Sequence, residues 1–166
     1  AQQIFSQYQA NGEFPPASLI PEDLKRWPAL GNPYFNDYYD FELPDASQGL
    51  GNFHDFDSDG LYDPTKGDYP SIDIRGCGTD QFPDVMYFFI YNDAGNIHNR
   101  TEGTPIRMEV QVQAYAYETQ DEVNNMTFYR YKLINRAPET IDSTFFSMWI
   151  DPDLGCPDDD YIGCDS

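Results

Sequence analysis

Positively charged side chains are scarce in this chain. Nine lysines and arginines stand against 29 aspartates and glutamates, which gives the 166 residues a formal net charge of -20. A protein that binds nucleic acid or an anionic membrane needs a positive surface to hold the phosphates. The composition therefore argues against both classes of partner, and it favours cations as ligands.

Long hydrophobic stretches are missing too. No apolar run approaches the roughly 18 residues of a membrane-spanning helix, so no transmembrane segment is predicted. The first residues, AQQIFSQYQANGEF, lack the basic and apolar segments of a signal peptide. Because the sequence does not begin with methionine and stops abruptly after DDYIGCDS, we expect it to be a piece of a longer protein or a processed product.

Cysteine and histidine are few. The chain has three cysteines and two histidines, and no spacing among them resembles a zinc site. Cys156 and Cys164 bracket a short acidic loop, and in an oxidising compartment we expect them to form a local disulfide. Cys77 would then be unpaired or bonded outside the chain. The alternative is three free thiols.

Aromatic residues, in contrast, are abundant. They make up 16% of the chain, with 13 tyrosines and 12 phenylalanines, and they favour strands and cores over disorder. Four segments of the second half have strand patterns. Two alternate between apolar and other residues, namely 107–118 and 126–136, and two are apolar on both faces, namely 84–93 and 143–151.

The joints between these segments are short and rich in turn residues, which favours an antiparallel sheet. Strands that are apolar on both faces need a second layer, so the predicted fold is mainly β, an antiparallel β-sandwich formed by residues 84–166. Residues 1–83 are rich in Pro, Gly, Asn and Asp and predict a long irregular segment with one short helix at 21–27.

The irregular segment contains a calcium-loop pattern. In HDFDSDGLYDPTK, Asp55, Asp57, Asp59 and Asp63 follow the spacing D-x-D-x-D-G-x-x-D. Alternate carboxylates can turn toward one cation, the glycine permits a sharp turn, and the carbonyl of Leu61 can add a ligand. The calcium hand has a glutamate at the twelfth position, where this chain has Lys66. The pattern is therefore more similar to the helix-free calcium loops of extracellular modules, and the alternative is a solvated acidic turn.

A second acidic cluster lies near the end of the sequence. DPDLGCPDDDYIGCD offers further carboxylates after the last expected strand, but its spacing matches no known loop. It predicts either a second cation site or a polar rim. The candidate ligands are Asp151, Asp153, Asp159, Asp160 and Asp165.

Signatures of catalysis are not legible in the sequence. There is no Ser/His/Asp pattern, no phosphate-binding glycine loop and no nucleophile elbow. Glycoside hydrolysis requires only two facing carboxylates, which this acidic chain could supply, so a secreted hydrolase using paired aspartates is the alternative function.

A family resemblance bears on location. The segments RWPALGNPY, DSDGLYDPTKGDYP, YNDAGN, VQAYAYET, NNMTFYRYKLINR and MWIDPDLGCPDDDYIGCD together resemble large proteins of Bacteroidetes-type bacteria that are exported by the type IX secretion system. The resemblance covers most of the chain from Trp27 onward. It implies export across both membranes and an extracellular or cell-surface location, and it supplies no catalytic residues.

These observations lead to one functional expectation. We expect a non-enzymatic module, stiffened by calcium, that serves adhesion or surface assembly. Its partners would be calcium together with other surface proteins, copies of itself or glycans.

Overall fold

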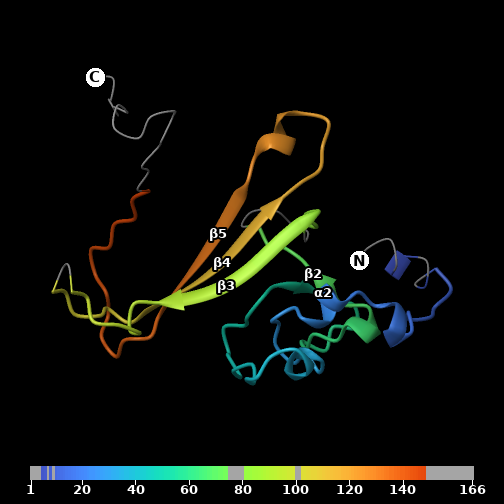
Figure 1. Ribbon diagram of the computed structural model, residues 1–166, viewed down its shortest axis with the longest axis horizontal. Helices are drawn as coiled ribbons and strands as arrows, with labels where there is room; N and C mark the ends of the chain where they lie inside the picture. Colours follow the sequence, from blue (N-terminus) through green and yellow to red (C-terminus); the bar gives the residue numbers. More distant parts are fainter. Residues whose placement is uncertain (1–4, 7, 9, 75–80, 100–101, 149–166) are drawn as a thin grey trace.

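The computed structural model describes residues 5–6, 8, 10–74, 81–99 and 102–148 (Figure 1). The fold is mainly β, with two antiparallel sheets. A two-stranded sheet pairs β1 (Phe53–His54) with β2 (Tyr69–Pro70). A three-stranded sheet has the order β3-β4-β5, with β3 at Val85–Asn92, β4 at Met108–Ala116 and β5 at Phe128–Asn135.

The strand predictions for 84–93, 107–118 and 126–136 are confirmed to within two residues at each end. The prediction for 143–151 is wrong in its described part, because residues 143–148 contain no strand. The rest of that segment lies outside the described residues. No second sheet among the described residues faces β3-β4-β5 in the way a sandwich requires, so this finer part of the fold prediction is not confirmed.

Among the described residues the helices with defined bounds are short, as expected for the first half. The predicted helix at 21–27 is present as α2 (Glu22–Lys25), which begins after Pro21. Four 3-10 turns accompany it: η1 at Ala17–Leu19, η2 at Phe35–Asp37, η3 at Pro64–Lys66 and η4 at Glu122–Asn125. No helix in the part of the chain that the structure describes is long and apolar enough to cross a bilayer.

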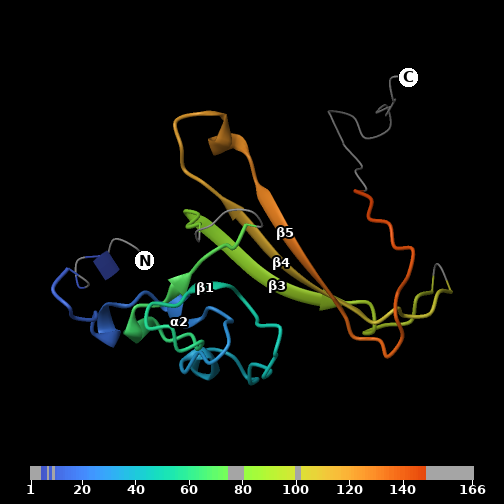
Figure 2. The same ribbon diagram turned by 180° about the vertical axis from the view of Figure 1, so that it is seen from behind.

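The three-stranded sheet has two chemically different faces. The inner face, which lies toward the first half of the chain, carries Met86 and Phe88 of β3 together with polar residues of β4 and β5 (Figures 1 and 2). The outer face carries the opposite set of alternating residues. Its β4 row is the one that the sequence pattern grouped together: Met108, Val110, Val112, Ala114 and Ala116.

Polar residues of the inner face are covered because the layer beneath them is made of loops. Loops leave backbone carbonyls without strand or helix partners, and these carbonyls need donors. Gln111 donates to the carbonyl of Gly49 and Gln113 to that of Ser71. Lys132 donates to the carbonyl of Gln48, and burial lowers the pKa of this lysine. In β4 and β5 the polar residues Gln111, Gln113 and Lys132 therefore lie on the covered face, although Val112 of the outer row is fully buried as well.

Apolar contact between the two halves centres on Trp27. Its indole is buried with Ala29 and Tyr62 and meets Phe88 of β3 at a ring distance of 5.9 Å. The indole N–H donates to the carbonyl of Asn52 at 3.1 Å. Residue 51 is glycine for a steric reason, because a Cβ at this position would lie 2.9 Å from the indole ring. This cluster attaches the irregular half to the sheet.

Candidate metal site

The acidic loop is closed at its base by the small sheet. Phe53 pairs with Pro70 and His54 with Tyr69, so the ends of the loop formed by residues 55–68 are held side by side. Three residues within the loop have positive φ: Ser58 at 60°, Gly60 at 80° and Gly67 at 101°. Glycine adopts this conformation without strain, which explains its place at the sharpest part of the turn.

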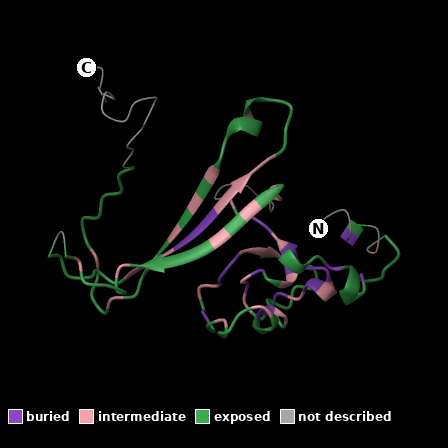
Figure 3. Cartoon of the chain, viewed as in Figure 1, coloured by how far each residue is buried: buried purple, intermediate pink, exposed green. Residues whose placement is uncertain are grey.

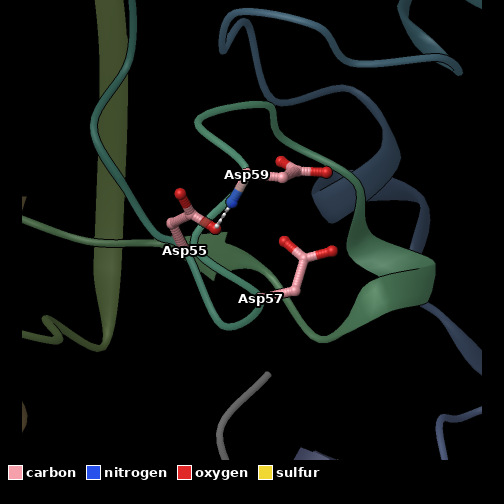
Figure 4. A group of neighbouring side chains, drawn as sticks. All are labelled: Asp55, Asp57 and Asp59. Carbon is pink, nitrogen blue, oxygen red and sulfur yellow. Dashed lines mark hydrogen bonds between the residues drawn. The ribbon is translucent and has the colours of Figure 1, made fainter.

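Three of the predicted ligands come together in this loop. Asp55, Asp57 and Asp59 each offer a carboxylate oxygen, and these oxygens lie within 4.8 Å of one another (Figure 4). The spacing predicted this convergence, because alternate residues of a tight loop turn to the same side. Among the described residues, no other group of His, Cys, Asp and Glu reaches this density.

Backbone amides hold two of the three carboxylates in position. The Asp55 carboxylate accepts hydrogen bonds from the N–H groups of Asp59, at 3.3 Å, and Gly60, at 2.8 Å. Asp59 accepts from the N–H of Leu61 at 2.8 Å. These bonds set the loop conformation without any cation and leave further oxygen lone pairs available for one.

Lys66 provides an internal counter-ion that the sequence pattern did not predict. Its Nζ lies 2.6 Å from Asp59 Oδ2 and 3.5 Å from Asp57 Oδ2. The hydrogen bond from Lys66 lowers the pKa of Asp59, and the same bond raises the pKa of Lys66. The pair therefore remains charged between the usual values of 3.8 for Asp and 10.5 for Lys. The residue that breaks the calcium-hand pattern therefore offsets one of the three negative charges of the cluster.

Asp63 is not part of the converging group. Its Oδ1 accepts from the backbone N–H of Thr65 at 2.9 Å and from the Thr65 hydroxyl at 2.6 Å, which caps η3. This is an ordinary N-cap role for aspartate. The Leu61 side chain is exposed, and a role for its carbonyl as a ligand stays a prediction.

Asp68 supports the loop from below. Its side chain is fully buried, and it accepts from the N–H of Phe56 at 2.9 Å and from the N–H of Asp63 at 2.8 Å. Burial raises the pKa of Asp68 and the two amide bonds oppose that rise. A buried acceptor that spans the two sides of the loop fixes their separation, so Asp68 is a structural residue of the site.

The second acidic cluster and the predicted disulfide fall outside the described residues. They comprise Asp151, Asp153, Asp159, Asp160 and Asp165, and the pair Cys156 and Cys164. Both stay predictions, as does the pairing of Cys77, which also lies outside the described ranges.

Two surface hollows bear on possible catalysis. One, of about 390 Å³, lies between the first half and β3, and its lining, which includes Phe35, Tyr39 and Phe41, contains no charged residue. The other, of about 350 Å³, contains a single carboxylate, Glu139, near Arg107. Neither hollow presents the pair of facing carboxylates that glycoside hydrolysis uses.

Comparison of the chain with protein-family models, with curated proteins and with solved structures found no match.

Proposed function

We propose that this chain is a non-enzymatic structural or binding module of an exported bacterial surface protein, stiffened by one calcium ion. The observation that carries the proposal is the convergence of three carboxylates, from Asp55, Asp57 and Asp59, in a loop that backbone hydrogen bonds already shape. Such oxygen-rich sites suit calcium, which accepts six to eight oxygen ligands in flexible geometry.

The remaining ligands would come from the same loop. In calcium loops the seventh residue contributes its backbone carbonyl and the ninth often acts through a water molecule. Leu61 and Asp63 occupy these positions, so Asp63 can cap η3 and still contribute through water. Calcium would compete with the Lys66 ammonium for Asp57 and Asp59, which predicts weak binding, at about 10⁻⁴ to 10⁻³ M.

Weak binding of this kind fits an extracellular location. Extracellular modules have sites in this affinity range, and calcium outside cells is abundant enough to fill them. The resemblance to exported surface proteins supports the same location. In this proposal the ion stabilises the irregular first half. That half would then serve as a rigid cap on a β-sandwich.

The two hollows described above bear on the alternative function, a hydrolase. A hydrolase would need two facing acids in a concave site, and the two hollows described above lack them. Adhesion or surface assembly would instead require an accessible binding surface on a stable scaffold. Other surface proteins, copies of the chain and glycans are the partner classes that this role allows.

The first test is thermal unfolding with and without calcium. We expect about 5 mM calcium to stabilise the wild type by roughly 1 to 2 kcal/mol relative to chelator, because binding to the native state alone shifts the equilibrium by mass action. Asp57→Asn should lose most of this shift, since it removes one of three converging carboxylates. Melting followed by circular dichroism measures both.

Asp142→Asn is the matched control, because it removes the same charge from an exposed position outside the loop. It should respond to calcium as the wild type does. If the wild type melts at one temperature with calcium and with chelator, or if both variants respond alike, the loop is not the site.

A further inference from the structure

The outer face of the three-stranded sheet is uncovered. Each strand places alternate side chains on it, and no described element lies over the rows of β3 and β5 (Figure 3), whereas Val112 in the central β4 row is fully buried. Its large exposed side chains have exposed fractions between 38% and 68%. They are Val85, Tyr87, Phe89 and Tyr91 of β3 and Tyr129, Tyr131 and Leu133 of β5.

This face is large enough for a stable interface. At about 200 Å² for a fully exposed aromatic side chain, and somewhat less for valine and leucine, these seven residues present on the order of 700 Å² of accessible surface. The largest apolar patch of a typical monomer is roughly 300–600 Å². A standard protein–protein interface buries about 800 Å² on each partner. The outer face therefore has the size of half an interface.

The outer face has two rows of aromatic side chains, which form ridges, with a row of smaller side chains between them. On β3, Phe89 and Tyr91 stack at a ring distance of 6.4 Å, and on β5, Tyr129 and Tyr131 stack at the same distance. Between these ridges lie the smaller β4 residues Ala114, which is partly buried, and Val112, which is fully buried, and both are in register with the aromatic residues on either side. The two ridges are separated by two strand spacings within the sheet, about 10 Å.

A second β-sheet is a better partner for this face than a single extended segment of the chain. The described residues 143–148 also expose large apolar side chains, with Phe145 92% and Phe146 72% exposed. However, they lie apart from the sheet in both views (Figures 1 and 2). A single strand laid on the face would also leave its own backbone N–H and C=O groups unpaired, which a hydrogen-bonded sheet does not.

Charge favours a like face as the partner. None of the outer-face residues of the three strands is charged, although the chain has a net charge of -20. Two copies can therefore meet here without bringing like charges into direct contact. A two-fold axis would pack the aromatic rows of the two copies against one another.

We propose that the outer face docks on the outer face of a second copy of this chain, forming a two-fold symmetric dimer with a sheet-on-sheet interface. Strands that are apolar on both faces predicted a second layer over the sheet. In the dimer, the partner copy supplies this layer. This proposal names a partner for the module proposed above, but it does not depend on the cation site.

Sedimentation velocity of the 166-residue chain in chelator tests the proposal. We expect a concentration-dependent dimer across about 10–500 µM, and we expect it to strengthen as salt rises from about 0.05 to 0.5 M, because salt screens the repulsion between two highly acidic copies. The double variant Tyr87→Thr, Tyr131→Thr should weaken dimerisation at least tenfold, since buried aromatic side chains dominate such interfaces. Threonine keeps the strand propensity and adds no charge.

Two control variants make the test specific to the face. Ile97→Thr removes an apolar side chain that is 87% exposed in a loop away from the sheet, and it should leave the dimer unchanged. Phe145→Ser with Phe146→Ser should do the same. A monomer at every concentration and salt, association that depends on Phe145 and Phe146, or open-ended association that the double variant does not reduce would each overturn the proposal. Because chelator removes calcium from the sample, this result does not depend on whether the acidic loop can bind calcium.

Discussion

Replacing Trp27 with alanine is expected to lower the free energy of unfolding by about 3 to 5 kcal/mol, the range measured for large aromatic residues in cores. The indole is 6% exposed, packs with Tyr62 and contacts Phe88 of the sheet. It also donates to the carbonyl of Asn52, which would be left without this partner. Urea unfolding followed by circular dichroism measures the change.

Trp27→Phe is the matched variant, since it keeps most of the apolar volume and loses only the N–H and part of the ring. Trp27→Phe should lower the free energy of unfolding clearly less than Trp27→Ala does. A loss below about 1 kcal/mol for the alanine variant would mean that Trp27 does not connect the two halves in the way the structure shows.

Replacing Lys66 is expected to change calcium affinity in a graded way. A unit charge about 5 Å from a divalent ion at a solvated surface contributes on the order of 1 to 2 kcal/mol, or roughly tenfold in affinity. Lys66→Gln removes the competing ammonium and should strengthen binding about tenfold. Lys66→Glu also adds a carboxylate at the position where calcium hands have one, and it should strengthen binding roughly 100-fold.

The same substitutions should affect the free protein in the opposite direction. Without Lys66, the carboxylates of Asp57 and Asp59 lose their counter-ion, so the melting temperature in chelator should fall in the order Lys, Gln, Glu. Isothermal titration gives the affinities and circular dichroism the melting temperatures. Equal affinities for all three chains, or weaker binding by Lys66→Glu, would contradict the assignment of Lys66 as the competing cation.

The strands could be predicted because their signal is local. Alternation in 107–118 and 126–136 reflects the pleat of a strand, and the register confirms that Val110, Val112 and Ala114 share one face. Which face is covered could not be predicted, since that depends on the layer beneath. Gln111 and Gln113 lie on the inner face because loop carbonyls from distant parts of the chain need donors.

The acidic loop could likewise be predicted only in part. Alternation brought Asp55, Asp57 and Asp59 together as predicted, because the effect needs only a tight turn. Asp63 followed a competing local rule, the capping of η3. The role of Lys66 depends on where its long side chain reaches across the turn, which spacing alone does not determine. The segment 143–148 has strand-forming residues but no described strand beside it, so its composition alone was insufficient.

Calcium binding by the acidic loop is measured most directly by isothermal titration of the 166-residue chain, with Asp57→Asn and Asp142→Asn titrated alongside. We expect one calcium ion bound at about 10⁻⁴ to 10⁻³ M by the wild type and by Asp142→Asn, and binding at least tenfold weaker for Asp57→Asn. Absence of binding to the wild type up to about 10 mM calcium, or equal binding by Asp57→Asn, would contradict it.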